Sequence, residues 1–130
     1  MQVGDVSAWE RTFTTEDVEQ FGRISGDLGV HHVQPDNQGR LLVQGLLTAT
    51  LPTKLGGDLN FIARELTFEF VRPVFTGDTI RCENTITRLE RREGATLMEA
   101  SFSCRNQHGK EVLIGHARGL IRDQGESNHG

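Results

Sequence analysis

The chain has 130 residues, of which 35% are hydrophobic and 25% charged, and its net charge is −4 at pH 7 with neutral histidines. These values are typical of one globular domain, and the acidic balance argues against nucleic-acid binding, which needs a concentrated basic surface. No apolar run approaches the roughly 18 residues of a membrane span and the first residues lack the features of a signal peptide, so we expect a cytoplasmic protein without a membrane partner.

The first predicted elements are a strand at residues 9–14 and a helix directly after it. Thr14 and Asp17 have the spacing of a capping box, with Asp in place of the usual Glu, and Gly26 is a natural helix end. Three apolar residues recur at helical spacing and should share one buried face: Val18, Phe21 and Ile24.

The segment SGDLGVHH, residues 25–32, follows this helix and places Asp27 five residues before His32. Two interpretations of this spacing are open when it is taken alone. The pair is either an acid/base couple or a turn carboxylate beside surface imidazoles. We expect the adjacent His31 to be a surface or packing residue.

From Leu41 the sequence becomes almost wholly apolar, LLVQGLLTATL, which predicts a buried helix. Gly45 near its start permits close approach of another group to the backbone. Pro52 lacks an amide hydrogen, so we expect the helix to end or kink there.

Four strands are predicted after this helix. In the first, which starts at residue 61, Leu66, Phe68 and Phe70 alternate with polar residues, as in a half-buried antiparallel strand. The other three are separated by the hairpin signals REG and NQHG and span about 79–91, 95–105 and 110–122. We therefore expect a single domain at residues 1–122 and a disordered tail at 123–130.

This element order predicts an α+β fold, in which an antiparallel sheet of about five strands wraps one apolar helix. One such sheet leaves an edge strand and part of the helix uncovered. A homodimer that joins two sheets is the simplest way to cover both.

The remaining polar and sulfur-containing residues give no second functional signal. We expect the cluster Arg88, Arg91 and Arg92 to end a strand and face solvent. The five histidines lack the spacing of metal ligands, so no metal site is expected. Cys82 and Cys104 are expected to be reduced and unpaired.

Three segments resemble, in order and spacing, the MaoC-like hotdog family: RTFTTEDVEQFGRISGD with the following HH, VQGLLTATL, and LTFEFVRPVFTGDTI. This family includes (R)-specific enoyl-CoA hydratases and 3-hydroxyacyl-thioester dehydratases. The resemblance extends from about Val3 to Arg122. It implies a hotdog fold and a hydro-lyase that acts on thioesters of CoA or acyl-carrier protein, with no metal or redox cofactor.

The resemblance also implies roles for individual residues. Asp27 and His32 match the family's catalytic acid/base pair, and the backbone N–H of Gly45 matches the donor that stabilises the thioester oxygen. The candidates for the substrate pocket are Gln44, Leu46, Leu47 and Phe68. Two other functions stay open, a hotdog thioesterase and a module that binds acyl thioesters without turnover.

Overall fold

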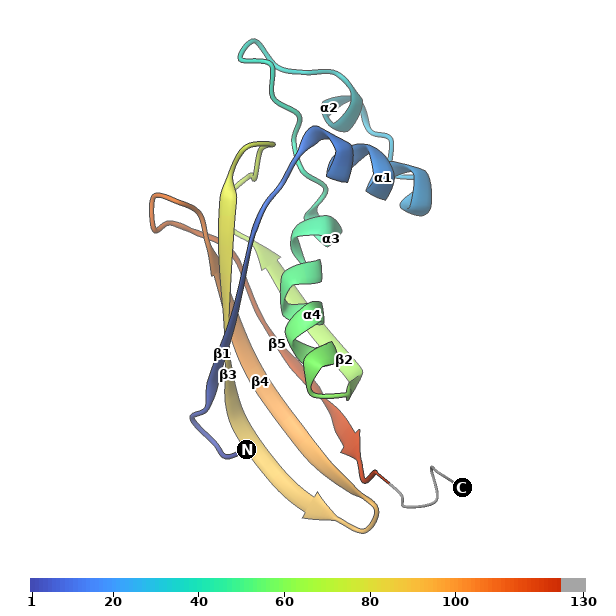
Figure 1. The fold of residues 1–130 in the computed structure, drawn as a ribbon, viewed down its shortest axis with the longest axis vertical. Coiled ribbons are helices and arrows are strands. Elements are labelled where there is room, and N and C mark those ends of the chain that lie inside the picture. Colours follow the sequence, from blue (N-terminus) through green and yellow to red (C-terminus); the bar gives the residue numbers. More distant parts are fainter. Residues whose placement is uncertain (125–130) are drawn as a thin grey trace.

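The computed structural model describes residues 1–124, and within them one antiparallel sheet curves around a central helix (Figure 1). The strands have the spatial order β1-β3-β4-β5-β2 and the bounds β1 Val6–Thr12, β2 Phe61–Phe70, β3 Thr79–Arg92, β4 Ala95–Arg105 and β5 Glu111–Arg122. The helices are α1 Thr15–Ser25, α2 Val30–Val33, α3 Gly45–Thr48 and α4 Thr50–Asp58.

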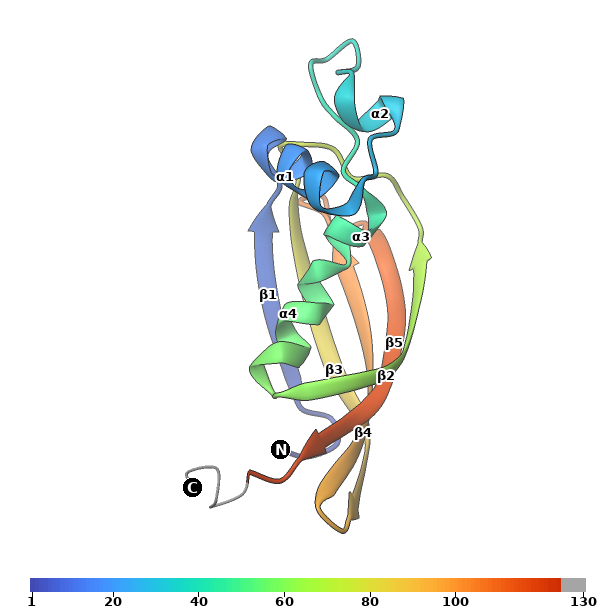
Figure 2. The same cartoon turned by 90° about the vertical axis from the view of Figure 1, so that its right-hand side faces the viewer.

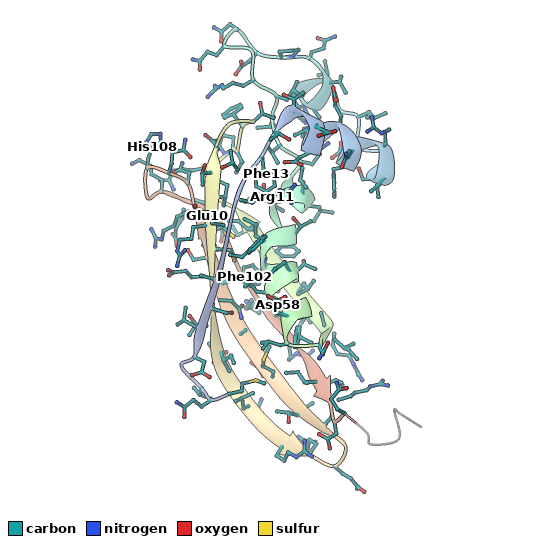
Figure 3. All side chains as sticks on the ribbon, in the orientation of Figure 1. Glu10, Arg11, Phe13, Asp58, Phe102 and His108 are labelled. Atoms are coloured by element: carbon teal, nitrogen blue, oxygen red, sulfur yellow. The ribbon has the colours of Figure 1, made fainter. Side chains whose placement is uncertain are left out.

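The helix α4 lies over the concave face of the sheet, between β1 and β2, while α1 and α2 lie together at one end (Figure 2). Apolar residues of α4, of the strands and of the segments that connect them form the larger of two core clusters, and the smaller contains Ile86, Met98 and Ala100. Phe13 and Phe102 belong to the larger cluster and are labelled in Figure 3. The expected α+β architecture, with a five-stranded sheet around an apolar helix, is confirmed.

The helix α1 has the predicted caps at both ends. The Thr14 hydroxyl accepts a hydrogen bond from the Asp17 N–H at 3.1 Å, and the Asp17 carboxylate accepts one from the Thr14 N–H at 2.9 Å. Gly26 ends the helix with φ 78°, a left-handed conformation that glycine adopts without strain. The expected burial of Ile24 was wrong, since this side chain is 86% exposed while Val18 and Gly22 are buried.

The central helix begins four residues later than the apolar run suggested. Leu42 and Val43 are extended instead, because Leu42 forms a β-bridge with Phe75 and the Val43 N–H donates to the Val74 carbonyl at 2.8 Å. The expected effect of Pro52 was misplaced, since the helix is interrupted at Ala49 and then continues to Asp58. Pro52 lies in the first turn of α4, where a missing amide hydrogen is tolerated.

The predicted hairpins join β3 to β4 and β4 to β5, and they bring the two cysteines together. Cys82 and Cys104 are directly opposite each other on β3 and β4, and both are free, buried thiols. A hydrogen bond with Cys82, together with burial, raises the pKa of Cys104 well above its ordinary value. The Cys104 thiol is therefore protonated and inert.

Surface ion pairs surround the end of the β3–β4 hairpin. The predicted solvent-facing position of the arginine cluster is confirmed: Arg88 pairs with Glu99 at 3.1 Å and Arg91 with Asp123 at 2.6 Å. Asp123 also donates its N–H to the Gly94 carbonyl, so the expected disorder of the tail does not extend to this residue. Residues 125–130 of that tail lie outside the described part of the chain.

No group of three or more histidine, cysteine, aspartate or glutamate side chains within residues 1–124 lies close enough to hold a metal ion. No helix of this part is long and apolar enough to cross a membrane. The cytoplasmic location stays a prediction.

Replacing Asp17 by alanine should destabilise the protein in a pH-dependent way. Partial burial alone would raise the pKa of Asp17, but hydrogen bonds from Thr14 and Arg11 outweigh it and hold this pKa below the usual value. The carboxylate therefore contributes stability above its unfolded-state pKa, and this contribution is lost as the pH falls through the folded-state value.

Urea unfolding should give a free energy about 1 kcal/mol lower for Asp17→Ala than for the wild type at pH 7. The difference should shrink in acid, below the range in which carboxylates titrate. A difference that stays constant down to that range would show that the charge of Asp17 contributes nothing to the cap.

Candidate active site

The most buried titratable side chain at the helical end of the molecule is His32, on the short helix α2. Only 6% of it is exposed. Its Nδ1 lies 2.6 Å from the backbone carbonyl oxygen of Leu42. Because a carbonyl oxygen can only accept, Nδ1 carries the hydrogen of this bond. In the neutral ring Nε2 is then left with a free lone pair.

Asp27 faces this lone pair from the turn between α1 and α2. Its Oδ2 lies 3.5 Å from His32 Nε2, and its side chain is 51% exposed. Both atoms are hydrogen-bond acceptors when His32 is neutral, and 3.5 Å is long for a direct bond. A water molecule, which has two donors, satisfies both acceptors at once. The pair is therefore arranged to hold and polarise water.

Two glycines lie in the connection between α1 and α2 that carries Asp27. Gly26 turns the backbone at the end of α1, and the Asp27 N–H then donates to the Ser25 hydroxyl at 3.0 Å. Gly29 precedes α2, and a Cβ on it would lie 3.1 Å from the His31 ring. His31 itself is exposed and contacts His32 edge-on, with 4.1 Å between the ring centroids.

A hollow of about 390 Å³ opens beside His32, and Gly45 lies on its wall. Gly45 is the first residue of α3, so its N–H has no acceptor within the helix. No hydrogen bond of this N–H to another backbone group occurs in residues 1–124. A Cβ at Gly45 would lie 2.8 Å from the ring of Phe70, so only glycine leaves this part of the hollow open.

A second hollow, of about 180 Å³, lies between α4 and the sheet. Its walls are mainly apolar, with Pro52 and Gly56 from the helix and Phe68 and Met98 from the strands. A row of aromatic rings links the two hollows. The centroids of Phe70 and Phe68 are 6.2 Å apart, and those of Phe68 and Phe102 are 5.7 Å apart.

The four predicted pocket residues occupy four different environments. Phe68 lines the second hollow. Gln44 is buried, and its amide donates to the Val18 carbonyl at 3.0 Å, which ties the start of α3 to α1. Leu47 belongs to the core, and Leu46 is 59% exposed and lines neither hollow.

Three residues at these hollows were missed by the sequence analysis. Thr48 lines the first hollow, and its buried hydroxyl has no hydrogen-bond partner within residues 1–124. Phe70 closes over Gly45, and Asn84 lines the second hollow. No local signal marks them, because each is brought to its hollow by packing between distant segments.

Comparison with known proteins gives matches to thioester dehydratases and hydratases. The model of the family "FAS1-like, dehydratase domain region" matches residues 5–114. The mitochondrial 3-hydroxyacyl-[acyl-carrier-protein] dehydratase of Arabidopsis thaliana is 24% identical over 131 residues, which cover 93% of this chain and 78% of that protein.

Solved structures agree with this match. The (R)-hydratase from A. caviae involved in PHA biosynthesis has a TM-score of 0.82 at 26% identity, covering 95% of this chain and 98% of that chain. The R-hydratase PhaJ1 from Pseudomonas aeruginosa has a TM-score of 0.81 at 21% identity, covering 95% of this chain and 84% of that chain. The hotdog fold implied by the sequence resemblance is thereby confirmed.

Replacement of the two adjacent histidines by alanine should have unequal effects on stability. His32→Ala leaves the partly buried Leu42 carbonyl without its donor, which should lower the free energy of unfolding by about 1–3 kcal/mol. His31→Ala removes an exposed ring and should change it by less than about 0.5 kcal/mol. Urea unfolding of both variants checks this, and equal losses would contradict the assigned role of the Leu42 contact.

Proposed function

The chain belongs to the family of FAS1-like dehydratase regions, and from this membership we propose that it is a hydro-lyase of acyl thioesters. It adds water to trans-2-enoyl thioesters and, in the reverse direction, removes water from (R)-3-hydroxyacyl thioesters. The observation that carries the proposal is the 3.5 Å approach of Asp27 Oδ2 to His32 Nε2 beside the hollow that holds Gly45. The acyl group is carried by CoA or by acyl-carrier protein.

In this proposal Asp27 and His32 bind the same reacting water, which lies beside the pair within hydrogen-bond distance of both. The His32 Nε2 lone pair accepts one proton from the water as its oxygen bonds to Cβ of the enoyl group. The Asp27 carboxylate orients the water and stabilises the imidazolium that forms. The Asp27–His32 pair then returns the proton to Cα, so that one water is added and no proton is left over.

In the same proposal the backbone N–H of Gly45 binds the thioester oxygen. Negative charge develops on the thioester oxygen while Cβ is attacked, and a fixed backbone N–H aimed at that oxygen stabilises it. The Gly45 N–H suits this role because it has no acceptor within its own helix and shares a hollow with His32.

The acyl tail extends along the row of aromatic rings from the first hollow to the second, which is the apolar space beside α4. Addition of water to a double bond changes no net oxidation state. We therefore propose no redox cofactor. The Gly45 N–H polarises the thioester oxygen in this proposal, so we propose no metal ion for that task, and the carrier is part of the substrate.

We propose in addition that two copies associate through β2. This strand is at an edge of the sheet. Leu66 and Phe70 lie on it with about half of each side chain exposed, and the exposed Leu46 follows Gly45, which contacts Phe70. An apolar edge of this kind is stabilised when a second strand covers it.

Sedimentation velocity should give a particle with twice the 14.5 kDa mass of the chain. Leu66→Glu, which places a charge on the β2 edge, should shift it to the monomer. Val6→Glu is the matched control, because Val6 is an exposed apolar residue on β1, at the opposite edge. Dissociation by Val6→Glu instead would show that the wrong edge was chosen.

The activity is tested with crotonyl-CoA by following the ultraviolet absorbance of the conjugated enoyl thioester together with the release of free thiol. The wild type should consume the conjugated bond without thiol release. Asp27→Asn should lower kcat by about 100-fold or more, because the water loses its anionic partner. Asp58→Asn is the control, since Asp58 is an exposed carboxylate at the end of α4, ion-paired with Lys54.

Two outcomes would contradict the proposal. Release of thiol, with the conjugated bond retained, would indicate the thioesterase. If the wild type, Asp27→Asn and Asp58→Asn all bind the substrate and none consumes it, the protein is the module that binds thioesters without turnover.

A further inference from the structure

Asn84 is a buried polar residue on the mainly apolar wall of the second hollow. It lies on β3, only 6% exposed, and lines the second hollow. Its side-chain amide has two donor hydrogens and one acceptor oxygen. Within residues 1–124 this amide forms no hydrogen bond to any other group. The fully enclosed side-chain atoms without a partner in this part of the chain belong to Gln44 and Thr48, so the amide of Asn84 is open to the hollow and can bond to what occupies it.

The neighbours of Asn84 do not offer it a partner. Phe102 is directly opposite it on β4, and Met98, Ala100 and Ala117 form the adjoining wall of the hollow. Thr53, from α4, also lines this hollow, but its hydroxyl donates its hydrogen to the Ala49 carbonyl at 3.0 Å and forms no hydrogen bond with Asn84. The amide of Asn84 is therefore the polar group that remains available to an occupant of the hollow.

The position of the hollow indicates which part of an acyl group reaches Asn84. Its helical wall begins at Pro52, seven residues beyond Gly45, which corresponds to about 10 Å along a helix. The reacting carbons lie near Gly45 and His32. Asn84 is therefore placed to meet the tail of the substrate and takes no part in the chemical step.

We propose that Asn84 selects acyl thioesters whose tail carries a hydroxyl or carbonyl oxygen. This inference rests on the proposed function, because it names the class of substrate for the same site. The hollow of about 180 Å³ is slightly larger than the roughly 150 Å³ that holds a benzene ring, so it admits a short oxygenated end group. An oxygen there satisfies the amide, whereas an unsubstituted alkyl tail leaves it unpaired.

The test compares trans-2-octenoyl-CoA with the same thioester carrying a terminal hydroxyl group. The wild type should hydrate the hydroxylated substrate with a kcat/KM about tenfold higher. Asn84→Leu, which has similar volume and no polar atoms, should abolish or reverse this preference and raise the melting temperature of the free protein. Thr85→Val is the control, because Thr85 is the next residue on β3 and faces the opposite side of the sheet.

Binding of the saturated thioesters, octanoyl-CoA and its terminal-hydroxyl counterpart, is measured by calorimetry and requires no turnover. Tighter binding of the hydroxylated thioester to the wild type supports the inference. If the wild type shows this preference in binding but hydrates neither enoyl substrate, the proposed function is overturned and the inference stands. Hydration of both substrates with preference for the unsubstituted tail would overturn the inference and leave the proposed function standing. The wild-type comparisons do not depend on how well Asn84→Leu folds.

Discussion

The hydrogen bond from His32 Nδ1 to the Leu42 carbonyl connects the short helix α2 with the segment that leads into α3. The backbone reinforces it, because the Leu42 N–H donates to the His31 carbonyl at 3.0 Å and Leu42 is bridged to Phe75. This arrangement fixes the tautomer of the ring and the direction of Nε2. A four-residue helix has little stability of its own, so the contact with Leu42 keeps His32 facing Asp27.

The same segment determines where the central helix begins. Because Val43 pairs with Val74, the chain remains extended up to Gln44 and the first helical N–H belongs to Gly45. Had the helix started at Leu41, as the run of apolar residues suggested, the Gly45 N–H would have donated within the helix. The pairing of an extended segment with the loop after β2 therefore leaves a backbone donor available in the hollow beside His32.

The concave face of the sheet is not uniformly optimised for stability. The open edge at β2 leaves Leu66 and Phe70 partly exposed, and the hollow beneath α4 contains the amide of Asn84, which has no hydrogen-bond partner within residues 1–124. Both features cost stability in the isolated chain. The proposed association of two copies would cover the apolar edge, and the proposed acyl substrate would fill the hollow.

Prediction from the sequence succeeded where structure depends on near neighbours. The capping box of Thr14 and Asp17, the left-handed Gly26 and the two hairpins follow from residues within a few positions of one another. The alternation of β2 likewise identified Phe68 as an inward-facing residue. For Asp27 and His32 the spacing alone favoured a turn over an acid/base pair, and the resemblance of the whole chain to a family reversed that preference.

Local sequence patterns therefore predicted the order of the elements, their caps and their turns, and the resemblance of the whole chain to a family pointed to Asp27 and His32. Tertiary structure alone decided that Cys82 lies against Cys104, that Asn84 enters an apolar hollow opposite Phe102, and that Leu46 remains outside. The physical reason is that strand register and helix placement bring together residues that are far apart in the chain. Local sequence patterns do not predict such long-range contacts.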